Sequence, residues 1–213
     1  MINKTFFLTI SLLLFSSFSF SQDMSFFITS EGPGDGANLG GLEGADAHCQ
    51  KLAESVGSDK TWGAYLAGQN PAVEARDRIG QGPWYNAKGD LIAENLTQLH
   101  VNPNLDGSTG LSEGGDPISG RAEARAGLGP NRHDILTGTP PDGTTFNFSS
   151  LGDRTCSDWT NSGEGTAFVG HFDRYGGGTT SWNSGHPTRN GGCSQEALRS
   201  TGGDGLFYCF AID

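Results

Sequence analysis

Histidine and aspartate residues in the second half of the chain carry the side chains best suited to metal or acid–base chemistry. His171 and Asp173 are two residues apart at the end of an expected strand, where alternate residues point to the same face. The pair His133-Asp134 and the single His186 could join them if the two late loops, residues 101–131 and 172–192, fold together. Two histidines and a carboxylate could bind Zn²⁺ and leave one position for water, or an aspartate could orient a histidine that acts as a general base. The alternative is that each histidine is a hydrogen-bonded structural residue.

A second group of residues suits recognition of a ligand. The loop 172–192 contains Tyr175, Trp182, Asn183, His186 and Arg189. Aromatic rings stack on sugar or peptide faces, and small polar residues adapt to a ligand by hydrogen bonding. The loop 101–131, with seven glycines, is the other long segment without a regular pattern, and loops of this length are often functional. We expect these loops to form a contact surface; the alternative is that they only pack.

Four arginines lie near the two late loops: Arg132, Arg154, Arg174 and Arg189. A planar guanidinium can recognise a carboxylate or an acidic sugar through two parallel hydrogen bonds. The alternative is a set of surface salt bridges, each of which contributes little to stability.

The composition argues against several functions. The 213 residues include 24 Asp and Glu against 13 Lys and Arg, and an acidic surface repels phosphate backbones and sulfated polysaccharides. Nucleic acid is therefore not an expected partner. The sequence has no Gly-x-Ser-x-Gly nucleophile turn and no phosphate-binding glycine loop before a helix. These patterns favour a binding module over an enzyme.

The first 21 residues are typical of a bacterial signal peptide. Lys4 supplies a positive start, residues 6–15 are mostly apolar, and Ser19 and Ser21 provide small side chains at the two positions read before an expected cleavage ahead of Gln22. The remaining residues 22–213 have the size of a single domain, which we expect to be extracellular or periplasmic. The apolar stretch is shorter than the roughly 20 residues that span a bilayer, so we expect no membrane insertion.

Hydrophobic periodicity predicts the elements that must position these residues. Residues 42–56 show helical spacing up to Gly57, and a second helix is expected from Pro71 to Ile79. A short helical turn is expected at residues 94–100. Strands are expected at 25–29, 62–66, 90–93, 146–148, 167–171 and 206–212. Segregated helices and strands with long loops between them indicate an α+β fold.

Four cysteines, Cys49, Cys156, Cys193 and Cys209, all follow the signal peptide. An even number in an exported protein predicts two disulfides, and the gaps of 107, 37 and 16 residues lack the paired short spacings of a zinc site. Three pairings are open from these positions alone. A bridge between the first helix and the last strand would tie both ends of the domain together.

Six short motifs follow one another along the chain: Ala45–Gln50 (ADAHCQ), Thr61–Leu66 (TWGAYL), Asn86–Ile92 (NAKGDLI), Pro141–Gly143 (PDG), Cys156-x-x-Trp159 and Tyr208-Cys209. Over residues 25–213, with 101–131 unmatched, this order resembles the C-type-lectin-like superfamily, and within it the endostatin branch of collagen C-terminal domains. The segments 27–30 and 38–41 also resemble uncharacterised bacterial secreted proteins of that fold. The resemblance implies nested disulfides, Cys49–Cys209 and Cys156–Cys193.

The functional sites of that superfamily match this chain only in part. Endostatin binds heparan sulfate through an arginine-rich face and zinc near its N-terminus, but this chain has nine Arg against 24 acids and no histidine before His48. Sugar-binding C-type lectins hold Ca²⁺ with a Glu-Pro-Asn or Gln-Pro-Asp loop and a Trp-Asn-Asp strand. Here Pro141-Asp142-Gly143 and Trp182-Asn183-Ser184 stand in the same order, without the leading acid or amide and without the second aspartate. Asp142 is thus a candidate metal ligand; the alternative is a turn beside a structural tryptophan.

The sequence therefore predicts a secreted binding module for a glycan, a cell-surface ligand or a matrix ligand. The first alternative is a metal-dependent hydrolase that uses His133, His171, Asp173 and His186, and the second is a purely structural surface protein. Ca²⁺ and Zn²⁺ are the candidate cofactors.

Overall fold

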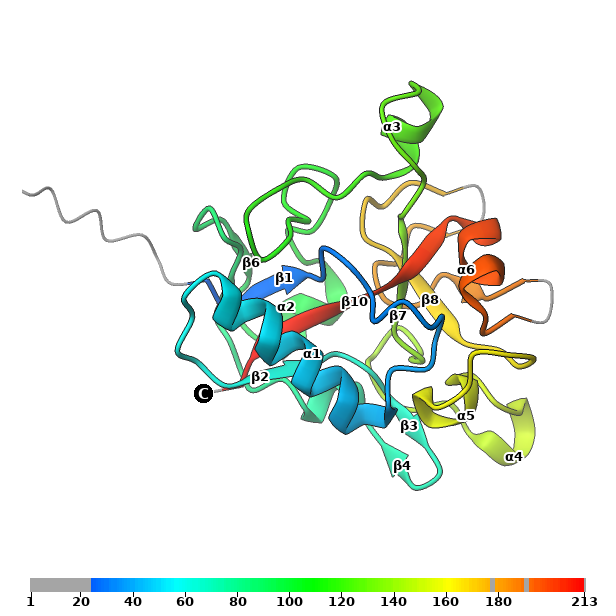
Figure 1. Ribbon diagram of the computed structural model, residues 1–213. Coiled ribbons are helices and arrows are strands. Elements are labelled where there is room, and N and C mark those ends of the chain that lie inside the picture. The colour runs from blue at the N-terminus through cyan, green and yellow to red at the C-terminus, as the bar shows by residue number, and fades with distance from the viewer. Residues whose placement is uncertain (1–23, 177–178, 190–191, 213) are drawn as a thin grey trace, which may run out of the picture.

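The computed structural model describes residues 24–176, 179–189 and 192–212, and they form a mixed α+β fold around one sheet (Figure 1). The sheet has the strand order β1-β10-β7-β8-β9, and β2 also pairs with β10. Its strands are β1 (Phe26–Ile28), β2 (Trp62–Ala64), β7 (Asp134–Leu136), β8 (Phe168–His171), β9 (His186–Pro187) and β10 (Gly203–Ala211). The long last strand β10 runs through the centre of the molecule and pairs with β1, β2 and β7.

Short elements surround this sheet. Two small hairpins pair β3 (Gly68–Gln69) with β4 (Ala72–Val73) and β5 (Trp84–Tyr85) with β6 (Leu91–Ala93). The helices are α1 (Gly41–Ser55), α2 (Leu96–Val101), α3 (Arg121–Arg125), α4 (Phe148–Leu151), α5 (Cys156–Trp159) and α6 (Gln195–Thr201), with a 3₁₀ turn η1 at Ala75–Asp77. Figure 1 shows α1 lying across the sheet, α6 beside one end of β10, and α3 projecting from the body of the protein.

The alternation of side chains along β10 divides the interior into two cores. Phe207, Cys209 and Ala211 belong to the core that α1 covers, whereas the intervening Leu206, Tyr208 and Phe210 belong to the core on the other face. Successive strand residues point to opposite faces, so one apolar strand can serve both cores. This strand therefore reads as a continuous apolar run.

Helix α1 is attached to the sheet by a disulfide and by a charged clamp. Cys49 on its buried face is bonded to Cys209 of β10. One turn earlier, the Asp46 carboxylate accepts a hydrogen bond from the Ala64 amide and pairs with the Arg78 guanidinium at 2.7 Å. Arg78 also donates to the Ala64 carbonyl. The covalent and polar contacts together hold the helix against β2 and β10.

Both predicted disulfides, Cys49–Cys209 and Cys156–Cys193, are confirmed. Two such bridges are consistent with an oxidising environment outside the cytosol. The expected signal peptide, residues 1–21, lies outside the described residues. Within the part of the chain that the structure covers, no helix combines the length and apolar character required to cross a bilayer.

Two predicted elements are wrong. The helix expected from Pro71 to Ile79 is replaced by the β3–β4 hairpin and by the short turn η1. The amides of Gln69 and Asn70 donate to the Asp158 carboxylate from a distant segment, and this tertiary contact overrides local helix preference.

The strand expected at residues 146–148 is the other error. Asn147 caps a helical turn by accepting a hydrogen bond from the Ser150 amide, so the chain enters α4 there. The residue pattern did not indicate β7 or α6, although the cap of α6 is a serine, Ser194, whose side chain accepts a hydrogen bond from the Ala197 amide.

We expect the outer disulfide to stabilise the fold more than the inner one. The bridges close loops of 160 and 37 residues, and the chain-entropy model gives about 5 and about 4 kcal/mol respectively. Urea unfolding of the double variants C49A/C209A and C156A/C193A measures both effects. Equal stability of the first variant and the native protein would contradict the structural role of the Cys49–Cys209 link.

Candidate metal centre

The sheet edge formed by β7, β8 and β9 brings three of the chemistry-bearing residues together. Asp134 is the cross-strand partner of His171, and His186 is the partner of Val169, two residues earlier on β8. Directly opposed and diagonal residues on one face of a sheet are within side-chain reach. His133 immediately precedes β7, so the alternation of side chains between the two faces of the strand does not fix the direction of its side chain. Register alone therefore places the Asp134 carboxylate among the imidazoles.

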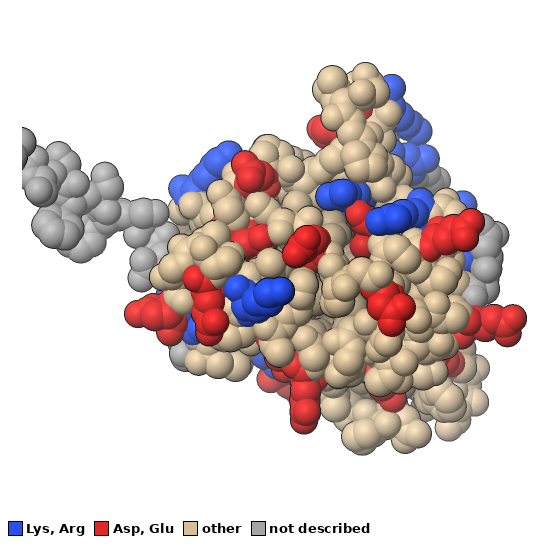
Figure 2. Space-filling view, viewed as in Figure 1, with Lys and Arg blue, Asp and Glu red and all other residues tan. Residues whose placement is uncertain are grey.

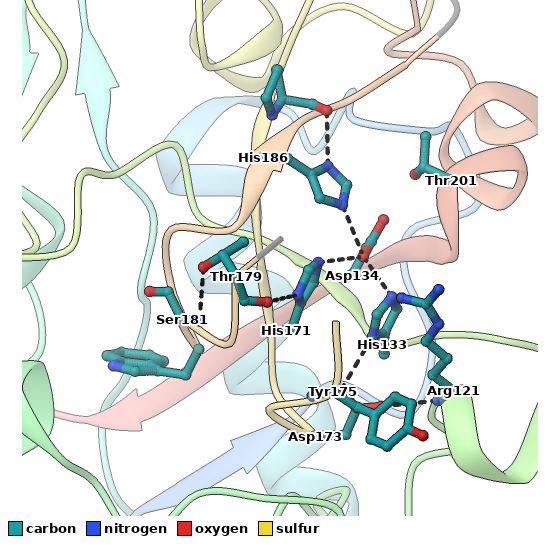
Figure 3. Close-up of polar contacts among 12 residues, drawn as sticks. Arg121, His133, Asp134, His171, Asp173, Tyr175, Thr179, Ser181, His186 and Thr201 are labelled. Carbon is teal, nitrogen blue, oxygen red and sulfur yellow. Dashed lines mark hydrogen bonds and ion pairs between the residues drawn. The ribbon is translucent and has the colours of Figure 1, made fainter. Parts of the chain in front are cut away.

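Three imidazole Nε2 atoms converge on one oxygen of Asp134 (Figure 3). The distances from Asp134 Oδ1 are 3.1 Å to His133, 3.3 Å to His171 and 3.6 Å to His186. The ligand atoms of His133, Asp134 and His171 all lie within 4.8 Å of one another. These three residues are 2–3% exposed, while the His186 side chain is 22% exposed. The first three form a compact buried set, and His186 flanks it on the solvent side.

The second nitrogen of each ring faces an acceptor. His133 Nδ1 lies 3.1 Å from Asp173 Oδ1, His171 Nδ1 lies 3.0 Å from the Thr179 carbonyl, and His186 Nδ1 lies 2.9 Å from the Pro187 carbonyl. Because a carbonyl or a carboxylate only accepts, each Nδ1 must carry the proton and donate. A neutral imidazole in this tautomer has a bare lone pair on Nε2. When all three rings are neutral, their Nε2 lone pairs therefore point toward the same carboxylate.

This arrangement leaves buried polar atoms without partners. Both carboxylate oxygens of Asp134 and the Nε2 atom of His171 are buried and receive no hydrogen bond of good geometry within the described residues. An unpaired buried polar group is costly, and a buried charge costs more. A cation between the carboxylate and the imidazoles would satisfy all of these atoms at once.

In the metal-free protein, a proton on His133 supplies positive charge next to the Asp134 carboxylate. Burial lowers the pKa of His133, but its contacts with Asp134 and Asp173 outweigh burial and raise the pKa to about 9. Burial raises the pKa of Asp134, yet its close contacts with His133 and His171, together with the positive charge of His133 and His186, lower that pKa well below its usual range. The site thus attracts positive charge, and a metal ion would displace this proton.

Asp173 contacts the cluster through the Nδ1 atom of His133. The sequence predicts that Asp173 shares a face with His171, but β8 ends at His171, so the alternation rule does not reach it. Its carboxylate accepts from His133 and from the amides of Arg121 and Tyr175. Burial raises the pKa of Asp173, whereas these hydrogen bonds lower it below its ordinary value. The carboxylate at the centre is Asp134, and Asp173 orients one of the imidazoles.

A polar cavity of about 450 Å³ opens onto this cluster. His133, His171 and His186 line it, together with Arg121 and Arg189. Gly185 also lines it, and a Cβ atom there would approach His171 Nε2 to 3.1 Å. The absence of a side chain at position 185 therefore keeps the cluster accessible.

Other residues expected at a ligand surface are in the interior. Trp182 and Asn183 are 2% and 1% exposed, because Trp182 packs against Tyr65 and Tyr208. The Asn183 amide donates to the Tyr65 hydroxyl and to the Pro141 carbonyl. These two residues anchor the base of the late loop and do not present their side chains to solvent.

Asp142, the expected calcium ligand, is apart from the histidine cluster. Its carboxylate accepts from the amide and the hydroxyl of Thr144, two residues away, as in a tight turn. Tyr175 is exposed and lies beneath the Arg125 guanidinium, 5.2 Å from it. His48 hydrogen-bonds to the Glu31 carbonyl, as expected of a structural histidine.

The arginines near the late loops have different partners. Arg132 pairs with Asp204 at 3.1 Å, and Arg154 donates to the Asp153 carbonyl. Arg189 lines the cavity, and so does Arg121, which the sequence analysis did not single out. Arg121 begins α3 inside the loop 101–131, where no periodic pattern signals its place.

Comparison with models of known protein families and with curated protein sequences gives no match for this chain. The geometry of the site is therefore the basis for assigning a function.

Substitution of Asn183 by Ala should lower the free energy of unfolding by about 1–3 kcal/mol, because it leaves the Tyr65 hydroxyl without a donor in the core. Asn104→Ala, at a residue whose exposed amide donates to the Leu91 carbonyl, is the control and should cost less. Urea denaturation checks both. An unchanged midpoint for the Asn183 variant would argue that its side chain is free for ligand binding.

Proposed function

We propose that this protein is an exported metalloprotein that holds a divalent transition metal, preferentially Zn²⁺, and uses it to bind a ligand in the adjoining cavity. His133, Asp134 and His171 are the ligands. The observation that carries this proposal is the convergence of imidazole Nε2 atoms on a buried carboxylate whose oxygens have no hydrogen bond of good geometry among the described residues.

The spacing of the donor atoms suits zinc. Tetrahedral Zn²⁺ with bonds of about 2.0–2.1 Å separates its ligand atoms by about 3.3 Å. The distances of Asp134 Oδ1 from His133 and His171 are 3.1 and 3.3 Å. Calcium prefers six to eight oxygen ligands, so two imidazoles disfavour it here.

The surroundings of the ligands also support a metal. In metal-binding histidines, the N–H group of the second ring nitrogen usually donates a hydrogen bond to a carboxylate or a carbonyl, and this bond fixes the tautomer. His133 donates to Asp173 and His171 donates to the Thr179 carbonyl, so both rings have such a partner. Three protein ligands leave a fourth position for an exogenous group, and the cavity provides access to it.

The same proposal includes a C-type-lectin-like architecture. It is supported by the nested disulfides, of which the outer one joins the first helix to the last strand. In this view the late loops contain the binding site, as the sequence predicts for a glycan or surface ligand. The recognition surface is then the wall of the metal cavity, since Trp182 and Asn183 are buried.

Metal-assisted hydrolysis is a second candidate function, and the position of His186 favours it. Its Nδ1 faces the Pro187 carbonyl, so its Nε2 is able to accept a proton from water at the cavity wall. Turnover of an ester such as 4-nitrophenyl acetate by zinc-loaded protein, lost in His186→Gln with zinc retained, would favour hydrolysis over binding alone.

Zinc should bind with a stoichiometry of one per chain and should be lost in Asp134→Asn and His171→Gln. Elemental analysis after dialysis and calorimetric titration of chelator-treated protein measure this directly. Zinc at about 100 times its Kd should also stabilise the native protein by about 2.7 kcal/mol.

Two matched variants serve as controls for this experiment. Asp142→Asn removes the other predicted metal ligand, and His48→Gln removes a histidine outside the cluster; both should retain zinc. Native protein that binds no zinc, or loss of zinc in Asp142→Asn with retention in Asp134→Asn, would refute the proposed site.

Asp173→Asn should weaken zinc affinity about 10- to 100-fold without abolishing it, because the outer partner of His133 would no longer be a charged acceptor. Competition with a chromogenic chelator gives the affinity, and urea unfolding in chelator shows whether the fold is intact. A loss of stability with unchanged zinc affinity would assign Asp173 a structural role only.

A further inference from the structure

We infer that the cavity beside the proposed zinc centre recognises a small hydroxylated carboxylic acid, of the chemical class of a uronic acid. This inference rests on the proposed function, because the metal would bind one carboxylate oxygen. The remaining selectivity comes from residues of the cavity wall that the metal site itself does not use.

The charge of the wall is opposite to the charge of the chain. The sequence has 24 acidic residues against 13 basic ones. Yet Arg121 and Arg189 line the cavity, and no Asp or Glu side chain is among the described residues that line it. Figure 2 shows several basic side chains on and below the projecting α3, with acidic side chains among them and over the rest of that face. A site of this polarity selects an anion.

Arg121 and the ligand His133 both donate hydrogen bonds to the Asp173 carboxylate. The Arg121 backbone amide donates to Asp173 Oδ2 at 2.9 Å, and Asp173 Oδ1 accepts from His133. Figure 3 shows the Arg121 guanidinium turned back toward the His133 ring. Within the described residues this guanidinium has no hydrogen-bond or ion-pair partner, so its planar fork is available to a carboxylate.

The wall also has a place for hydroxyl groups. Asn131 lines the cavity, and its Oδ1 atom is buried without a hydrogen-bond partner in the described part of the chain. A hydroxyl donor from a bound ligand would satisfy this acceptor. Thr201 Oγ1, also at the wall, donates to the Leu198 carbonyl and has lone pairs left to accept. A sugar acid supplies several hydroxyl donors on carbon together with its carboxylate, whereas a hydrogenphosphate dianion supplies a single P–OH donor.

The size of the cavity agrees with such a ligand. A volume of about 450 Å³ falls in the lower part of the roughly 300–1,000 Å³ range of small-ligand sites. Several hydrogen-bonding groups around a confined anion position are typical of sites that fix the orientation of a small polar molecule.

Calorimetric titration of the zinc-loaded full-length mature protein with galacturonate and glucuronate tests this inference. Glucose is the matched neutral probe, and inorganic phosphate is the matched anion without hydroxyl carbons. We expect saturable binding of a uronate, at least about tenfold weaker binding of glucose and phosphate, and at least about tenfold weaker uronate binding in Arg121→Gln and Arg189→Gln. Zinc content should be unchanged in both variants.

Arg125→Gln is the control variant, because Arg125 lies on the same helix but faces Tyr175 outside the cavity wall. It should bind uronate as the native protein does. Stoichiometric zinc without uronate binding, equal binding of glucose or phosphate, or an equal effect of all three arginine variants would overturn this inference and leave the zinc site standing. Absence of zinc from the native protein would overturn the proposed function and the inference together.

Discussion

Strand β10 is the constraint on which the rest of the fold depends. It pairs with β1 and β2 along residues 208–211 and with β7 along residues 203–207, so it is the link between the early and late halves of the sheet. Its alternating side chains contribute to both cores, and Cys209 bonds it to α1. Because β7 pairs with β10, the position of Asp134 depends on β10. The C-terminal end of β10 lies far from Asp134, beside α1.

This rigidity makes the buried cluster possible. A carboxylate surrounded by three imidazoles has a large desolvation cost, and a flexible site would rotate these groups toward water. Here Asp134 and His171 are opposed in a sheet, and each ring is held by a partner for its Nδ1 atom. The surrounding structure therefore keeps the polar groups facing one another. A metal ion would convert this unfavourable arrangement into a favourable one, which couples ligand binding at the site to stability of the fold.

The late loops show how a glycine-rich chain can still position functional side chains. The loop after β8 is fastened by the burial of Trp182, by the Asn183 hydrogen bonds and by the Cys156–Cys193 bridge. His186 and Arg189 then reach the cavity from the following segment. The large aromatic residue Trp182 acts as an anchor in the core, and the smaller polar and charged residues line the cavity. This division of roles is common where a rigid scaffold supports a binding loop.

The sequence by itself determined the features that depend on composition or on local order. Counting cysteines in an expected exported chain predicted two disulfides, helical spacing predicted α1, and the apolar run at residues 206–212 predicted the last strand. It also identified His133, His171 and His186 as residues that could share a site. Only the tertiary structure decided that Asp134 is the central carboxylate, that Trp182 is buried, and that Arg121 lies at the cavity. Those outcomes depend on the cross-strand register of β7 and β8 and on contacts between distant segments, which no local pattern of residues encodes.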